Sequence, residues 1–225
     1  MIFFSRKTLL SSGVFRGMTD YHSHILPGVD DGLRTMEDSL AVLKYFEGLG
    51  IESVWCTPHI MEDIPNTTER LRIRFAELQN AYSGPIRLHL AAENMLDGLF
   101  VERLEQGDLL PLTEEGGYLL VETSYFNPPS NLDELLKDTM SAGYFPVMAH
   151  PERYVYMGKA DYHRLYDMGV KFQLNLLSLA GAYGHDEQEK AQYLLKNKMY
   201  SFQGTDIHSL KSFEQKIQHK IKVKL

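Results

Sequence analysis

Cysteine is almost absent from this chain, which carries a single thiol, Cys56, among 225 residues. One thiol cannot form an internal disulfide, so nothing in the composition calls for an oxidising compartment. We therefore expect a cytoplasmic protein. Cys56 itself is expected to be a small buried hydrophobic residue.

Long hydrophobic runs are also lacking. No stretch approaches the ~20 apolar residues that a membrane-spanning helix needs, so we predict no membrane insertion. The opening segment Met1–Phe15 is too short and too polar in its centre for a secretory signal. We predict that residues 1–16 form an N-terminal extension, which is either a disordered tail or an arm whose Ile2-Phe3-Phe4 packs on the body of the protein.

Basic charge is scarce as well. The chain has 30 acidic and 23 basic residues, a formal net charge of −7, and only Lys216–Lys224 is locally basic. Duplex nucleic acid is excluded as a partner, because such binding depends on a basic face that neutralises phosphates. No Pro-rich or Gly/Ser-rich linker divides the chain, so residues 17–225 are predicted to form a single domain.

The sequence does contain alternating strand-like and helix-like segments. Apolar segments rich in β-branched and aromatic residues predict parallel strands at 18–25, 53–59, 87–94, 118–124, 146–150, 171–176 and 200–208. Helical spacing of apolar residues predicts helices at 36–48, 67–82, 99–106, 132–142, 162–168 and 188–197. This repeated βα pattern fits an α/β protein with either an open doubly wound sheet or a closed barrel. The first strand is not followed by a Gly-rich phosphate turn, which favours the barrel.

The first predicted strand ends in Asp20-Tyr21-His22-Ser23-His24. Side chains alternate along a strand, so His22 and His24 point to the same side. Beside Asp20 they offer nitrogen and oxygen ligands that suit zinc, manganese or iron. The alternative is a pair of buried histidines satisfied by backbone carbonyls.

Most of the other predicted strands also end on potential metal ligands. They are His59, Glu93, Glu122, His150, Asp206 and His208, and Asp31 lies in the loop after the first strand. The carboxyl ends of parallel barrel strands meet at one rim, so these donors should converge. Glu93 and Glu122 follow apolar runs, where an unpaired carboxylate is costly; each alone could instead form an ion pair, for example with Arg153. Nine donors in all exceed one tetrahedral site and imply two or three ions.

Closely spaced ions with mixed imidazole and carboxylate ligands are typical of phosphoester hydrolysis. Arg153 could bind a phosphate, although a surface ion pair is an equal alternative. The residues around Cys56 contain no Cys-x5-Arg loop, so a cysteinyl-phosphate route is not available. Aromatic residues beside the donors could form walls for a ring, or could simply pack at the rim; these are Tyr21, Tyr125, Phe126 and Tyr154.

Six motifs together resemble the polymerase and histidinol phosphatase (PHP) superfamily, and within it the manganese-dependent protein tyrosine phosphatases of the CpsB/YwqE type. They are Asp20–His24, Asp30-Asp31-Gly32, Thr57-Pro58-His59, Ala92-Glu93-Asn94, Ala149–Tyr154 and Thr205–His208. The resemblance runs from about Gly17 to about Ser212. It implies a distorted (β/α)7 TIM-like barrel with three divalent metal ions at its C-terminal rim, manganese first, with iron, zinc and magnesium also compatible.

The resemblance also implies roles for individual residues. His22, His24, Glu93 and Asp206 would hold one ion; Glu93, Glu122 and His150 a second; and Asp31, His59 and His208 the third. Arg153, Glu93 and His150 are the predicted catalytic residues, with Arg153 on the phosphate and a metal-bridging hydroxide as the nucleophile. A second basic residue that is common in the family has no direct counterpart, and Lys211 and Lys216 are the nearest.

The function implied by the resemblance is hydrolysis of phosphotyrosine on a bacterial tyrosine kinase of capsule or exopolysaccharide synthesis. One alternative keeps the site but acts on a small phosphomonoester such as histidinol phosphate. Another is a non-catalytic regulatory module that keeps metal ions for folding.

Overall fold

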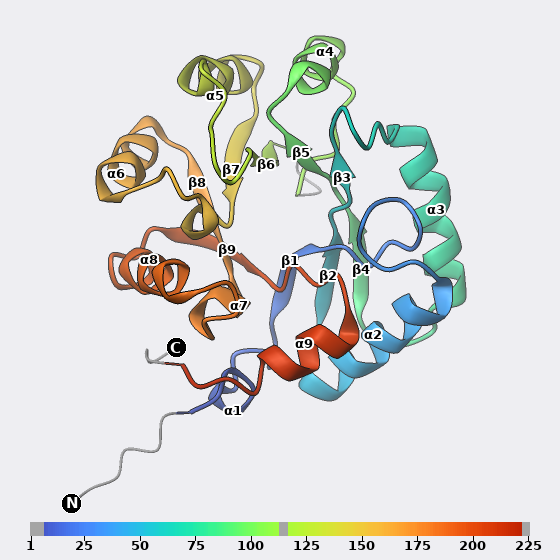
Figure 1. The fold of residues 1–225 in the computed structure, drawn as a ribbon. Coiled ribbons are helices and arrows are strands. Elements are labelled where there is room, and N and C mark those ends of the chain that lie inside the picture. The colour runs from blue at the N-terminus through green and yellow to red at the C-terminus, as the bar shows by residue number, and fades with distance from the viewer. Residues whose placement is uncertain (1–6, 113–116, 222–225) are drawn as a thin grey trace, which may run out of the picture.

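Parallel strands occupy the centre of the computed structural model, which describes residues 7–112 and 117–221, and helices surround them (Figure 1). The strands are β1 (Thr19–Ser23), β2 (Ser53–Cys56), β3 (His59–Ile60), β4 (Arg87–Leu90), β5 (Glu93–Met95), β6 (Tyr118–Glu122), β7 (Phe145–Ala149), β8 (Lys171–Asn175) and β9 (Tyr200–Gly204). Each predicted strand range overlaps at least one of them, and every pairing between these strands is parallel. The α/β class with a parallel arrangement is confirmed.

Helices follow most of the strands, as predicted. They are α1 (Leu9–Ser12), α2 (Met36–Leu49), α3 (Thr68–Ala81), α4 (Gly98–Gln106), α5 (Leu132–Ser141), α6 (Lys159–Met168), α7 (Leu176–Leu179), α8 (His185–Lys196), α9 (Leu210–Lys216) and the 3₁₀ turn η1 (Pro151–Arg153). Local signals fix several ends: the Thr35 hydroxyl accepts from the Asp38 amide at the start of α2, and Gly50 ends it with φ 83°.

Two predicted strands are each interrupted. The second predicted strand divides at Thr57-Pro58, where proline offers no N–H to a neighbouring strand, and the third divides at Ala91-Ala92. Among the described residues the strands therefore form two sheets, with orders β1-β2-β4 and β3-β5-β6-β7-β8-β9. These sheets do not form the one continuous closed ladder of an ideal barrel.

Backbone and side-chain hydrogen bonds connect the segment just after β9 to β1, and so join the two sheets. The Asp206 amide donates to the His22 carbonyl at 2.7 Å. The buried Asp20 carboxylate accepts from the Thr205 amide at 2.9 Å and from its hydroxyl at 2.6 Å. The end of β9 is thus held beside β1, and the loops that follow both strands lie together.

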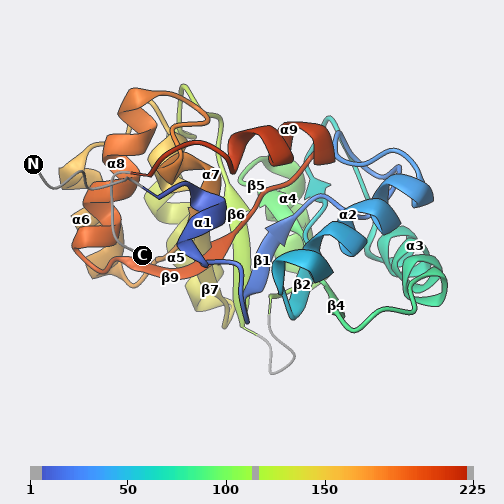
Figure 2. The ribbon, with the colours of Figure 1, turned by 90° about the horizontal axis from the view of Figure 1, so that it is seen from below.

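The segment before β1 packs on the body of the protein. Thr8 forms an antiparallel bridge with Lys220, Leu9 is fully buried, and the ring of Phe15 meets that of Phe213 at 5.8 Å between centroids. This N-terminal arm, residues 8–16, thereby supports α9, which lies across one end of the strands (Figure 2). The predicted packing of Ile2-Phe3-Phe4 falls outside the described residues.

Truncating the arm's aromatic anchor should destabilise the protein. Phe15 is 2% exposed, so Phe15→Ala is expected to lower the free energy of unfolding by about 3–5 kcal/mol. Thermal melting measures this, with a decrease in Tm on the order of 10 °C. The matched control is Phe126→Ala, because Phe126 is 72% exposed; its Tm should stay near that of the parent chain. Equal melting of the two variants would show that the arm contributes no stability.

Candidate metal centre

The nine predicted donors lie in one connected cluster at the carboxyl ends of the strands. His22 belongs to β1, and His24 follows it; Glu122 ends β6, and His150 follows β7 directly. The interruptions of two strands place His59 and Glu93 side by side as register partners of β3 and β5. The convergence expected from strand topology is therefore present in the geometry. The role of each residue as a ligand stays a prediction.

The innermost group contains His22, His24, Glu93 and Asp206. The Nε2 atom of His22 lies 3.1 Å from Nε2 of His24 and 3.0 Å from Oε2 of Glu93. Oδ1 of Asp206 is 3.5 Å from the first imidazole nitrogen and 3.3 Å from the second. All four side chains are at most 3% exposed. Four donor atoms so close together, deep in the protein, form an environment that suits a cation.

The electrostatics of this group favour positive charge. Burial alone would lower the pKa of His22, but the carboxylates of Glu93 and Asp206 outweigh burial and raise it to about 9. The pKa of His24 is also raised, because Asp30 and these carboxylates outweigh the effect of burial. In return, the imidazoles hold the pKa of Glu93 and that of Asp206 well below their ordinary values despite burial. A bound metal ion would supply the same compensating charge.

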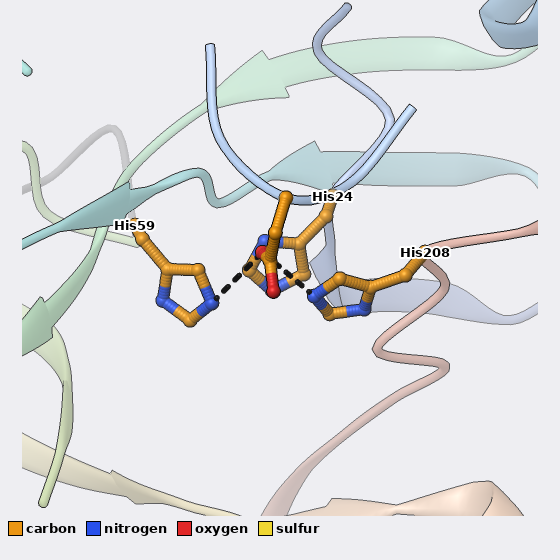
Figure 3. Close-up of side chains that lie close together, drawn as sticks. His24, His59 and His208 are labelled. Carbon is orange, nitrogen blue, oxygen red and sulfur yellow. Dashed lines mark ion pairs between the residues drawn. The ribbon is translucent and has the colours of Figure 1, made fainter. Parts of the chain in front are cut away.

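A second group lies nearer the surface. His24, His59 and His208 point toward a common region (Figure 3), and the His24 and His208 rings stack at 4.0 Å between centroids. Oδ1 of Asp31 lies 3.5 Å from Nε2 of His59 and 3.3 Å from Nε2 of His208, the contacts marked by dashed lines. A hydrogen bond from His208 is the main cause that lowers the pKa of Asp31 to about 2.

Glu122 and His150 complete the cluster, but in different neighbourhoods. Oε1 of Glu122 lies 2.9 Å from Nδ1 of His59, and the ligand atoms of Glu122, His59 and Glu93 fit one candidate site. Nε2 of His150 lies 3.1 Å from Oε1 of Glu93, and its ring also falls in a candidate site with His22 and Asp206. Glu93 therefore lies between the two neighbourhoods.

Buried polar atoms in the cluster lack hydrogen-bond partners. Nδ1 of His59 and Oε1 of Glu122 have none of acceptable geometry among the described residues, although they face each other. Burial and the nearby charge of Glu93 raise the pKa of Glu122. Burial, reinforced by Arg153, lowers the pKa of His150 to about 4, so its imidazole is neutral near pH 7 and able to ligate a metal. These unpaired donors fit divalent cations.

Two of the donors have unusual backbone geometry. His150 and Asp206 have φ values of 32° and 51°, in the left-handed region that non-glycine residues rarely adopt. Each directly follows a strand or lies just beyond its end, where the bend turns the side chain toward the cluster. Such conformations cost on the order of 1–3 kcal/mol each and concentrate at functional sites.

A glycine allows β9 to lie against the first histidine. A Cβ atom on Gly204 would come within 2.5 Å of the His22 Cβ and 2.7 Å of its backbone nitrogen. Gly204→Ala is therefore expected to displace His22 and to reduce kcat/KM for the phosphoester hydrolysis expected from the sequence on the order of 100-fold. Gly48→Ala is the control, because a Cβ there meets nothing within 4 Å. Full activity in the Gly204 variant would contradict this role of the close approach.

A cavity of about 430 Å³ opens above the cluster. Arg153 lines it, with its guanidinium 4.5 Å from the Tyr125 ring centroid and 4.1 Å from that of Tyr183. Its Nη1 donates to Oδ2 of Asp206 at 2.7 Å. Arg153 thus forms an ion pair inside the cavity rather than on the open surface, and the two rings hold it in place.

The predicted aromatic walls are only partly correct. Tyr125 lines the cavity. Tyr154 is fully buried, and its hydroxyl accepts from the Thr123 amide. Tyr21 packs on Phe202 at 5.0 Å between centroids, and Phe126 points into solvent. Nearness to a donor in sequence did not indicate whether each ring would line the cavity, pack in the interior or face solvent.

Sequence reasoning missed several cavity and cluster residues. Tyr183 follows α7, far in sequence from any donor, and its ring centroid lies 4.1 Å from the Arg153 guanidinium and 5.2 Å from the Lys216 ammonium. Gln173 contacts His22 from the middle of β8, and Asp30 contacts His24. The adjacent Asp30 and Asp31 in the sequence could have indicated that a second carboxylate, Asp30, lies near the histidines. Cys56 is buried, which raises the pKa of its thiol, as expected for an inert residue.

Comparison with known proteins agrees with this geometry. A family model described as capsular polysaccharide synthesis, CpsB/CapC, matches residues 18–223. Tyrosine-protein phosphatase YwqE of Bacillus subtilis is 28% identical over 201 residues, covering 87% of this chain and 79% of its own. Tyrosine-protein phosphatase CpsB of Streptococcus pneumoniae is 28% identical over 210 residues, covering 87% and 84%.

A solved structure is also similar. It comes from a crystallographic study of YwqE from Bacillus subtilis and CpsB from Streptococcus pneumoniae, which are described as metal-dependent tyrosine phosphatases. The TM-score is 0.80 at 26% sequence identity, covering 89% of this chain and 84% of the other. In the described part of this chain, no helix has the length and apolar character needed to cross a membrane.

Proposed function

This chain belongs to the CpsB/CapC family of capsular polysaccharide synthesis, and from that premise we propose that it is a metal-dependent protein tyrosine phosphatase. Its substrate would be phosphotyrosine on a bacterial tyrosine kinase of capsule or exopolysaccharide synthesis. The observation that carries the proposal is the cluster of buried imidazoles and carboxylates beneath a cavity lined by Arg153. We place the reaction in the cytoplasm, the compartment that a single buried thiol favours.

The proposal assigns the donors to three divalent ions, with manganese as the first candidate and iron, zinc and magnesium as others. The first ion would be held by His22, His24, Glu93 and Asp206, the second by Glu93, Glu122 and His150, and the third by Asp31, His59 and His208. When bound, such ions lower the pKa of water and neutralise phosphoryl oxygens. The close contacts of Glu93 with four imidazoles support its place between ions.

Arg153 would bind the substrate phosphate in this scheme. A guanidinium has five N–H donors, and Asp206 takes one of them through Nη1. The remaining donors are available to phosphate oxygens. The rings of Tyr125 and Tyr183 both contact the guanidinium, so substrate binding needs little reorganisation of the side chain.

The lining of the cavity suits an aromatic substrate. Beside Tyr125 and Tyr183, the walls include Leu177, Phe213 and Met95. Apolar and aromatic surfaces pack favourably against a phenyl ring, whereas the charged cluster below suits a phosphate. This combination favours phosphotyrosine over histidinol phosphate, whose imidazole and amine are polar.

The proposed fold is a distorted (β/α)7 barrel formed by residues 17–225, preceded by residues 1–16 as an N-terminal extension. In support, side chains from several different strands meet in one interior cluster that includes Trp55, Leu120 and Val147. Phe202 of β9 contacts Tyr21 at 5.0 Å and Tyr118 at 5.2 Å between ring centroids. Contacts of one ring with β1 and β6 are expected when strands curve around a shared interior.

A substrate comparison tests the proposed function. Protein loaded with Mn²⁺ is assayed on a phosphotyrosine peptide and on histidinol phosphate, and the expected result is a higher kcat/KM for the peptide. His150→Ala should remove activity, because His150 contacts Glu93 in the cluster. The control is His163→Ala, an exposed histidine that bonds the Tyr193 hydroxyl.

Each other outcome has a defined meaning. Equal activity of His150→Ala and the parent chain would overturn the proposal. Preference for histidinol phosphate would favour the small-molecule alternative. Metal-dependent melting without turnover on either substrate would favour the non-catalytic module.

A further inference from the structure

Two side chains outside the predicted ligand set contact the far sides of the innermost histidines. Nδ1 of His24 lies 2.8 Å from Oδ2 of Asp30. Nδ1 of His22 lies 2.9 Å from Oε1 of Gln173. Both partner side chains are buried, with Asp30 fully shielded and Gln173 at 0% exposure.

Other bonds fix the orientation of each partner. Oδ1 of Asp30 accepts from the Gly32 amide at 3.0 Å, and its Oδ2 also accepts from the His59 amide at 3.1 Å. The Gln173 Nε2 donates to the Leu174 carbonyl at 2.6 Å, which directs its oxygen toward His22. The same oxygen accepts from the His150 amide at 3.2 Å. Neither partner can rotate without losing a buried hydrogen bond.

The partners determine which ring nitrogen carries the proton. Each offers an oxygen that only accepts, so Nδ1 of each imidazole must donate. In the neutral form of each ring, which is the form that ligates a metal ion, Nε2 is then unprotonated. The two Nε2 atoms lie 3.1 Å apart, and both approach Oε2 of Glu93, at 3.0 and 3.2 Å. When both rings are neutral, these three electron-rich atoms repel one another, and a metal ion among them would replace the protons that hold them together in metal-free protein.

We infer that Asp30 and Gln173 are positioning residues that fix the Nδ1–H tautomers of His24 and His22 and direct both Nε2 lone pairs toward a single metal ion. This inference rests on the metal centre of the proposed function. Partners of this kind orient ligating imidazoles and increase their basicity, and their loss weakens metal binding 10- to 100-fold. The two neighbouring aspartates therefore have different roles. Asp31 is a proposed metal ligand, whereas Asp30 positions the His24 ring.

Metal affinity is the primary test. Isothermal titration with Mn²⁺ compares the parent chain with Gln173→Met, which removes the acceptor, and with Gln173→Glu, which keeps it. Gln173→Met and Asp30→Asn are expected to weaken Mn²⁺ binding 10- to 100-fold. Gln173→Glu is expected to keep most of the affinity of the parent chain. The control is Glu152→Gln, a buried carboxylate bonded to the Asn175 amide and the Tyr200 hydroxyl; its affinity should match the parent chain.

Nuclear magnetic resonance of the ring nitrogens separates positioning from a structural role. With Zn²⁺ as a diamagnetic probe, the parent chain should show protonated Nδ1 and metal-shifted Nε2 for His22 and His24. Gln173→Met should lose the slowly exchanging Nδ1 proton of His22, whereas Gln173→Glu should retain it. If Asp30→Asn does not fold, the two Gln173 variants decide the question.

The outcomes distinguish this inference from the proposed function. A parent chain that binds neither Mn²⁺ nor Zn²⁺ would overturn the metal centre itself. A parent chain that binds both ions, with Gln173→Met within threefold of its affinity or with coordination through Nδ1, would overturn only the positioning role.

Discussion

Glu93→Gln is expected to reduce phosphotyrosine hydrolysis by at least about a thousandfold, equivalent to about 4 kcal/mol of transition-state stabilisation. Oε2 of Glu93 lies 3.0 Å from His22, 3.2 Å from His24 and 3.2 Å from His59. Oε1 lies 3.1 Å from His150. The substitution keeps the shape of the side chain but replaces one oxygen with an amide that only donates. Because Glu93 is proposed to contact two ions, the substitution would weaken the binding of both.

Steady-state kinetics in saturating Mn²⁺ measures this effect. A parallel measurement of bound metal should show fewer ions in the variant than in the parent chain. Glu62→Gln is the control, because Glu62 is a surface carboxylate that accepts from the Gly98 amide. Activity of Glu93→Gln within tenfold of the control would contradict a central role for this carboxylate.

Removal of divalent ions should make stability depend on pH in a defined direction. The pKa of His22 rises from 6.5 to about 9 on folding, because nearby Glu93 and Asp206 outweigh the effect of burial. Its contribution is therefore fully present below about pH 6.5 and is lost as pH rises through about 9. The size is on the order of 3 kcal/mol. Metal-free protein should lose roughly 5–10 °C of Tm over this interval.

Bound ions should reverse this trend. Metal ligation requires deprotonated imidazoles, so affinity for Mn²⁺ increases with pH. The difference in Tm between loaded and chelated protein should therefore widen from pH 6 to pH 9. Calorimetric scans in Mn²⁺ or in chelator measure this difference. Parallel Tm profiles for the two forms would show that these imidazoles do not bind the ions.

The carboxylates determine how the stability of metal-free protein changes at acidic pH. The imidazoles hold the pKa of Glu93 and of Asp206 well below their ordinary values despite burial. The stabilisation they provide is present above the ordinary carboxylate pKa and is lost as pH falls through the lowered values. The cluster therefore stabilises metal-free protein most in the weakly acidic to neutral range.

The positions of the donors could be predicted because the carboxyl ends of parallel strands lie together, even when the strands are far apart in sequence. His59 and Glu93 are 34 positions apart in the chain, yet they are register partners on adjacent strands. Hydrophobic periodicity was enough to locate the strands, and the carboxyl ends of parallel strands meet on one side. The same argument could not predict the breaks at Thr57-Pro58 and Ala91-Ala92, which depend on how the strands curve.

Other features depend on side-chain direction, which periodicity does not supply. Tyr154 and Tyr125 both lie near predicted donors, but Tyr154 is fully buried whereas Tyr125 faces the cavity. Gln173 lies inside a strand with no charge to mark it, and Tyr183 reaches Arg153 from the segment after α7. Their roles arise from tertiary packing and could be found only in three dimensions.

Measuring metal content and phosphatase activity on the same samples tests the central claim most directly. Metal-free protein is titrated with Mn²⁺, and bound ions per chain are determined by elemental analysis alongside hydrolysis of a phosphotyrosine peptide. The account predicts no hydrolysis without metal and full activity only as binding approaches three ions per chain. Undiminished hydrolysis by protein shown to contain no metal would contradict it.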